Sequence, residues 1–143
     1  MMDRKRLIEA AFEARKNSYS PYSSYRVGAA LLCDDGTVVK GCNIENASYG
    51  ATICAERVAV FSAVASGKRS FCAIAIVGGS YDEEDNTSDY AYPCGICRQV
   101  LREFTDPESF SVIVARSAEI YEEYTLNELL PNSFGPNNLK QEN

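Results

Sequence analysis

The chain of 143 residues contains no histidine and no tryptophan. Without histidine it cannot form a Ser-His-Asp triad, a Cys-His nucleophilic pair or a metal site with an imidazole ligand. Proton transfer must therefore be carried out by a carboxylate, a lysine, a tyrosine, a cysteine or water. Any zinc ion would have to be held by cysteine or carboxylate groups.

Long apolar runs and an excess of basic residues are also missing. No stretch approaches the roughly 20 apolar residues that span a bilayer, and the charged segment 1–6 does not lead into an apolar signal core. We therefore expect a cytoplasmic protein that does not bind a membrane. The net charge of -6 makes nucleic acid a poor partner, because such binding depends on Lys and Arg contacts to phosphates. A small, roughly neutral ligand fits better.

Apolar periodicity predicts one domain over residues 1–143. The first element is a packing helix within residues 1–17, and the last segment is a polar, frayed tail at 137–143. A β-hairpin is predicted at 25–33 and 37–42, because the two β-prone segments are joined by the turn Asp34-Asp35-Gly36.

The second half of the sequence predicts a strand-helix-strand unit. The apolar run 71–77 is typical of a strand buried on both faces and ended by Gly78-Gly79-Ser80. A helix to about Phe104 and a buried strand at 111–115 follow, which predicts a parallel pair of strands. The remaining predicted elements are an acidic, solvated loop at 82–89, a polar edge strand at 119–124 and a short helix with a capping box from Thr125.

The helix that begins near Cys54 is apolar around nearly its whole circumference from Val58 to Ala65. Such a helix must be covered on both sides. In a domain this small, a sheet can cover one side while another subunit covers the other. We therefore expect a homo-oligomer.

The cysteines supply a candidate metal site. Cys94 and Cys97 lie at i and i+3 at the start of one predicted helix, and Cys54 starts another. If both helices begin at the same sheet edge, three sulfurs can reach one zinc ion and leave its fourth position to water, as in catalytic sites. A redox-active CxxC pair, or a structural site with a fourth sulfur from Cys33 or Cys42, are the alternatives. We expect the other three cysteines to be small buried hydrophobes: Cys33, Cys42 and Cys72.

Glu56 is the candidate proton carrier beside such an ion. Side chains in the first helical turn lean toward the N-terminus, so its carboxylate and the sulfur of Cys54 can both reach a point beyond the helix end. There the carboxylate can take and deliver protons without being a ligand. Three thiolates would leave the ion with a net negative charge, which Arg57 can reduce by donating toward sulfur. A surface salt bridge is the alternative role for Arg57.

Asn43 and Glu45 are candidate ligands for a sugar. If the chain is still extended there, residues i and i+2 point the same way, and an amide beside a carboxylate can bind a diol. The alternative is that 43–50 is only a connecting loop.

Several further motifs follow in order along the chain: Ser20-Pro21-Tyr22-Ser23, Arg26-Val27-Gly28-Ala29-Ala30, Asn43-Ile44-Glu45-Asn46-Ala47-Ser48-Tyr49, Cys54-Ala55-Glu56-Arg57, Pro93-Cys94-Gly95-Ile96-Cys97-Arg98-Gln99, Glu128-Leu129-Leu130-Pro131 and Phe134-Gly135-Pro136. With these motifs, the sequence resembles the zinc-dependent cytidine deaminases of the short-chain, homotetrameric type. The resemblance covers residues 20–139.

The resemblance implies an α/β fold with three α-β-α layers around a mixed five-stranded sheet. It implies one Zn²⁺ per subunit on Cys54, Cys94 and Cys97, and hydrolytic deamination of cytidine and deoxycytidine in pyrimidine salvage. Glu56 would protonate N3 of the base and then the departing amino group.

The resemblance also implies the substrate-binding residues. Asn43 and Glu45 match the ribose-binding pair, and Tyr25 stands where the family usually has a phenylalanine against the base. The other implied positions lie near the pocket, partly of a neighbouring subunit: Ala47, Tyr49, Ala55 and Phe134. The alternatives are a deaminase of a nucleoside antibiotic, a polynucleotide deaminase, and a structural zinc or redox protein without activity.

Overall fold

The computed structural model describes residues 2–139. A five-stranded sheet with the order β2-β1-β3-β4-β5 lies at its centre. Its helices and strands are α1 (Arg4–Arg15), β1 (Tyr25–Cys33), β2 (Val38–Cys42), α2 (Ala55–Ala65), β3 (Phe71–Ser80), α3 (Gly95–Phe104), β4 (Ser111–Ala115), β5 (Tyr121–Thr125) and α4 (Leu126–Leu129), with 3₁₀ turns η1 (Tyr49–Ala51) and η2 (Pro136–Asn138).

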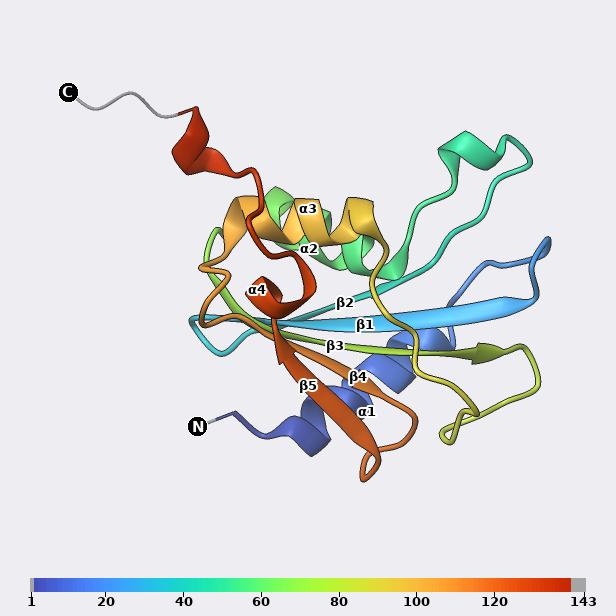
Figure 1. Cartoon of the computed structure of the whole chain (residues 1–143). Coiled ribbons are helices and arrows are strands. Elements are labelled where there is room, and N and C mark those ends of the chain that lie inside the picture. Colours follow the sequence, from blue (N-terminus) through green and yellow to red (C-terminus); the bar gives the residue numbers. More distant parts are fainter. Residues whose placement is uncertain (1, 140–143) are drawn as a thin grey trace.

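The sheet is mixed because β3 and β4 pair in parallel, whereas all other pairs are antiparallel. Helix α1 lies on one face of the sheet, and α2 and α3 lie side by side on the other (Figure 1). This arrangement confirms the predicted three-layer α-β-α fold, the hairpin and the parallel strand pair.

Each face of the sheet has its own apolar core. On one face, Asp3 caps α1 by accepting a hydrogen bond from the Arg6 amide. The predicted stripe of α1, which includes Ile8 and Phe12, packs on small and branched residues of β1, β3 and β4. On the other face, α2 packs through alanines and Val60, so its backbone lies close to the sheet.

The contact between α1 and β1 depends on Gly28. A Cβ atom at this position would lie 2.0 Å from the Ala11 carbonyl oxygen and 2.6 Å from the Arg15 amide nitrogen. We expect Gly28→Ala to lower the free energy of unfolding by about 3 kcal/mol, the upper end for overpacking, because both neighbours are backbone atoms. Denaturant unfolding measures this loss. Gly50→Ala is the control, since nothing lies within 4 Å of its added Cβ; equal stability of the two variants would contradict the prediction.

Three expectations need correction. Strand β3 does not end before Gly78 but continues to Ser80, because β1 starts at Tyr25 and pairs with it over its full length. The glycines instead leave room above the strand: a Cβ at Gly78 would meet the Tyr25 ring and Ala91. Cys72 is exposed and Cys42 half-buried, so of the three remaining cysteines only Cys33 is a buried hydrophobe.

The acidic loop at 82–89 is held more firmly than its charge suggests. The buried Arg15 side chain donates to the carbonyl oxygens of Ser80, Glu83 and Glu84. Thr87 is buried as well. These contacts fix the start of the segment that leads to Ala91 and on to α3.

Helices α2 and α3 begin at the same end of the molecule (Figure 1). The start of α2 at Cys54 and the start of α3 at Cys94 therefore lie close together, although 40 residues separate them in the sequence. The predicted tail at 137–143 starts in η2, and residues 140–143 lie outside the described part. Within residues 2–139, no helix is long and apolar enough to cross a membrane.

Candidate active site

Two cysteines occupy the N-cap positions of the paired helices. Cys54 precedes α2 and Cys94 precedes α3, both with extended backbone angles, and neither side chain caps its helix. Their sulfurs are therefore free to bind something else. Cys97 lies in the first turn of α3 and is completely buried.

The three sulfurs converge on one point. Cys54 Sγ lies 3.9 Å from Cys94 Sγ, which lies 3.5 Å from Cys97 Sγ, and all three lie within 4.8 Å of one another. A tetrahedral zinc ion with Zn–S bonds of ~2.3 Å requires sulfur separations of about 3.8 Å. The cluster therefore fits one Zn²⁺ per chain, in agreement with the predicted ligand set. It is the one group of three or more potential ligands in residues 2–139, which contradicts a four-sulfur site with Cys33 or Cys42.

The cluster already carries the electrostatic features of a cation site. Arg57 donates from Nη2 to Cys54 Sγ over 3.4 Å, as the sequence predicted. Hydrogen bonding from Cys97, and then from Arg57, lowers the pKa of Cys54. The hydrogen bond to Cys54, together with burial, raises the pKa of Cys97. Three thiols this close cannot all ionise without a cation, which is what thiolate ligation of zinc supplies.

Glu56 lies beside this cluster in the first turn of α2. Its side chain is almost completely buried, with 4% of the residue exposed. Burial raises its pKa to about 7, because the charged carboxylate loses its hydration. A carboxyl group with such a pKa can both hold and release a proton near neutral pH.

A cavity of about 300 Å³ opens onto Glu56, Cys54 and Cys94. Of the residues predicted for substrate binding, Tyr25, Asn43 and Ala55 line it together with Cys54 and Cys94. The sequence did not indicate six further lining residues: Val27, Thr52, Ile53, Ile76, Ala91 and Tyr92. The position of Tyr92, two residues before Cys94, is a signal that could have indicated it, whereas Val27 and Ile76 are placed there by the sheet.

Asn43 and Glu45 lie in adjoining hollows. Asn43 lines the cavity, but its side chain accepts from the Val27 amide and donates to the Tyr25 carbonyl, each over 2.9 Å. Glu45 lines a neighbouring groove of about 360 Å³, and Thr52 borders both spaces. Its carboxylate accepts from the backbone amides of Tyr22 and Ser23 and from the Ser23 hydroxyl. These hydrogen bonds, that of the hydroxyl first, lower its pKa and keep it charged.

The remaining predicted positions lie outside the cavity. Tyr49 is exposed on η1 and borders the groove beside Glu45, where its ring packs edge-on against Tyr22. Ala47 is exposed and lines neither space. Phe134 is 58% exposed on the segment after α4, and its backbone oxygen accepts from Gln99 Nε2.

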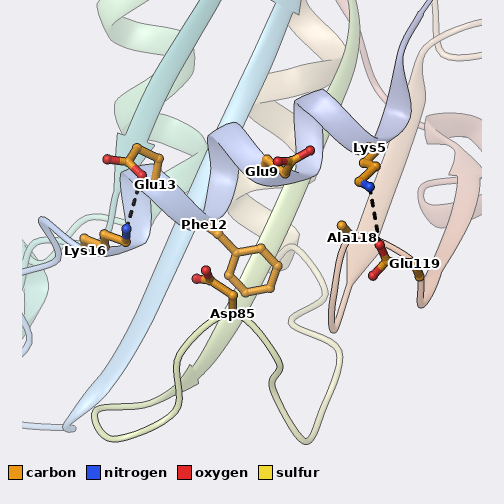
Figure 2. Close-up of a pocket in the computed structure, with 8 residues that line it drawn as sticks. All are labelled: Lys5, Glu9, Phe12, Glu13, Lys16, Asp85, Ala118 and Glu119. Atoms are coloured by element: carbon orange, nitrogen blue, oxygen red, sulfur yellow. Dashed lines mark hydrogen bonds and ion pairs between the residues drawn. The ribbon is translucent and has the colours of Figure 1, made fainter.

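A second hollow of about 370 Å³ lies on the opposite layer, between α1, the acidic loop and the turn before β5 (Figure 2). Both of its lysines form ion pairs: Lys5 Nζ lies 3.6 Å from Glu119, and Lys16 Nζ lies 3.3 Å from Glu13. Its side chains do not converge on one point as the sulfurs do. The chemistry therefore belongs to the Glu56 cavity.

Comparison with known proteins agrees with this geometry. Residues 1–113 match the family described as the cytidine and deoxycytidylate deaminase zinc-binding region. The cytidine deaminase of Halalkalibacterium halodurans is 47% identical, over 93% of this chain and 95% of its own. The blasticidin-S deaminase of Bacillus cereus is 31% identical, over 92% of this chain and 91% of its own.

Solved structures give the same result. The crystal structure of cytidine deaminase from Burkholderia pseudomallei matches with a TM-score of 0.82 and 45% identity, over 93% of this chain and all of that one. The three-sulfur cluster at two helix starts, the buried carboxyl group beside it and these similarities lead to one conclusion. The chain belongs to the zinc-dependent cytidine and deoxycytidylate deaminase family.

Proposed function

We propose that this protein hydrolytically deaminates cytidine and deoxycytidine to uridine and deoxyuridine, with release of ammonia. The observation that carries the proposal is the buried Glu56 carboxyl group beside the cluster of Cys54, Cys94 and Cys97, in a cavity large enough for a pyrimidine. Bound zinc would be held by the three sulfurs and would supply a water activated for attack at C4. The protein supplies the proton transfers and the binding of the nucleoside.

Glu56 is the proposed proton carrier. Its pKa near neutrality suits a group that takes the two protons of the attacking water in turn, delivering the first to N3 of the base and the second to the departing amine. Because the chain contains no histidine, no imidazole competes for this role. Arg57 holds the Cys54 sulfur in place and reduces the negative charge of the three thiolates.

The cavity walls suggest how the nucleoside is oriented. The Tyr25 ring, over Gly78, and the small Ala55 side chain border the space for the flat base. Asn43 and the charged Glu45 are proposed to bind the ribose, which would lie across the Thr52 border between cavity and groove. Asn43 must then exchange or share one of its backbone hydrogen bonds.

We further propose that residues 1–143 work as one domain within a cytoplasmic homotetramer. One side of α2 remains partly uncovered by the sheet, with Phe61 45% exposed. In the tetramer, other subunits would cover this side of α2. They would also cover Tyr49 and Phe134, which would then lie near the active site of a neighbouring subunit. The described cysteines are all free thiols, which suits a reducing compartment.

Ammonia release from a set of substrates tests the function. We expect turnover of cytidine and deoxycytidine by protein that contains one zinc per chain, because the proposed ribose ligands recognise the sugar and Glu56 serves the base. Blasticidin S, single-stranded DNA and zinc-free protein are the controls. Turnover of blasticidin S without turnover of cytidine would assign the antibiotic instead, and activity confined to DNA would overturn the proposal.

A further inference from the structure

Tyr92 forms part of the cavity wall and is held by a carboxylate from the far edge of the sheet. Its hydroxyl donates to Glu122 Oε1 over 2.6 Å, and the Tyr124 hydroxyl donates to the same oxygen over 2.9 Å. Both bonds involve a carboxylate, and such charge-assisted bonds are shorter and stronger than neutral ones. A ring that borders the cavity is therefore tied to an acceptor on β5.

The Tyr92 ring also contacts two neighbouring aromatic rings. Its centroid lies 6.2 Å from that of Tyr90 and 6.5 Å from that of Tyr124, both in tilted orientations. Rings at these separations attract one another. With its hydroxyl bonded and a ring on each of two sides, Tyr92 has little freedom to leave the cavity wall.

The sheet provides the anchor because side chains alternate along β5. Glu122 and Tyr124 share one face and meet the Tyr92 segment, whereas Glu123 points to the other face and pairs with Arg4 of α1. Within residues 2–139, Glu122 forms no ion pair with a basic side chain, and its two hydrogen-bond donors are tyrosine hydroxyls. Its position is therefore explained by the aromatic wall and not by an ion pair of the fold.

We propose that Tyr92 is a specificity-determining residue that limits the size of the base at C5, and that Glu122 is the residue that positions it. This inference rests on the proposed function. In cytosine, the groups attached next to the reacting C4 are N3, the amine and C5. N3 and the amine take part in the reaction. A substrate that has an additional substituent next to C4 must therefore have it on C5. Tyr92 precedes Cys94 by two residues and lines the same cavity as Cys94 and Glu56, so its ring borders the end of the cavity where C4 would react.

The test compares cytidine with 5-methylcytidine and bulkier 5-alkyl cytidines. Tyr92→Ala and Tyr92→Leu should raise KM for cytidine by about tenfold, the loss of roughly one aromatic contact. They should also raise kcat/KM for 5-substituted substrates relative to cytidine. Two substitutions are used because the alanine variant could fail to fold. The leucine variant still packs against the neighbouring apolar side chains and allows the test in that case. Zinc content and the thermal midpoint are measured for each.

The anchor is tested separately. Tyr92→Phe and Glu122→Gln remove or weaken the bond without removing the ring. Both should raise KM for cytidine a few-fold, less than the full loss of a hydrogen bond to a charged group, because the bond affects the substrate only through the position of the ring. Their kcat should stay near that of wild type. Matched controls are Tyr121→Phe and Glu123→Gln, which make the same chemical changes on the opposite face of β5 and should leave KM and selectivity unchanged.

The outcomes separate this inference from the proposed function. If wild type deaminates cytidine but the Tyr92 and Glu122 variants keep its KM and its selectivity against 5-substituents, the inference is wrong and the function stands. Equal effects from the Glu123→Gln control would also overturn it, because they would indicate a general loss of structure. If zinc-loaded wild type does not act on cytidine, the proposed function is wrong, and this inference, which depends on it, is wrong as well.

Discussion

Replacing Glu56 with glutamine should lower kcat for cytidine by about 10²–10⁴-fold, the range typical for loss of a general acid or base. Glutamine has nearly the same size and can fill the same buried position, but it cannot exchange a proton in this pH range. Because Glu56 is buried and its pKa is raised by that burial, a neutral side chain avoids the cost of burying charge. The variant should therefore fold with a thermal midpoint equal to or above that of wild type.

Steady-state kinetics, zinc analysis and thermal unfolding of Glu56→Gln together test this expectation. Zinc should remain at one per chain, since the three sulfurs are unchanged, and KM should change less than kcat. Glu103→Gln is the control, because it removes one carboxylate from an exposed position on the neighbouring helix α3. Near-normal turnover by a folded, zinc-loaded Glu56→Gln would remove Glu56 from the mechanism.

The second large effect is expected from Cys94→Ala. Cys94 supplies one of three sulfurs that converge within 4.8 Å, and two sulfurs cannot offer zinc the same site. Zinc affinity should fall by more than about 100-fold, the largest loss that removal of a supporting partner typically produces. Turnover should fall in proportion to the zinc that remains, and the thermal midpoint should lose its dependence on added zinc.

Cys72→Ala is the matched control for this substitution, because Cys72 is also an exposed cysteine but lies in β3, outside the cluster. It should retain one zinc per chain and full activity. Metal analysis after dialysis, a thermal shift with zinc and an activity assay separate the two variants. Retention of one tightly bound zinc by Cys94→Ala would show that the ligand set is different.

Much of the fold could be predicted because local patterns report local structure. The stripe of α1, the turn of the first hairpin and the capping box at Thr125 each involve residues within a few positions of one another. The prediction for β3 was wrong for a non-local reason. Gly78 and Gly79 look like a strand end, but pairing with β1 continues the strand through both of them.

The candidate site shows the same division. The absence of histidine limits the metal ligands to cysteine and carboxylate, and the order of motifs indicates the family. Cysteine spacing alone left open a redox pair, a three-sulfur site and a four-sulfur site. Only the layered packing, which places the starts of α2 and α3 together, selects three sulfurs and leaves Cys33 in the apolar core.

The sequence by itself determined the residue types that can do the chemistry: cysteines as zinc ligands, and Glu56 as a carboxylate within two positions of one of them. The tertiary structure decided how these groups meet. It buried Glu56 and thereby raised its pKa, and it joined Tyr92 to Glu122 across 30 residues of chain. The physical reason is that caps and periodicities act between neighbours in sequence, whereas burial and long-range hydrogen bonds depend on how the sheet aligns its strands and which helices cover it.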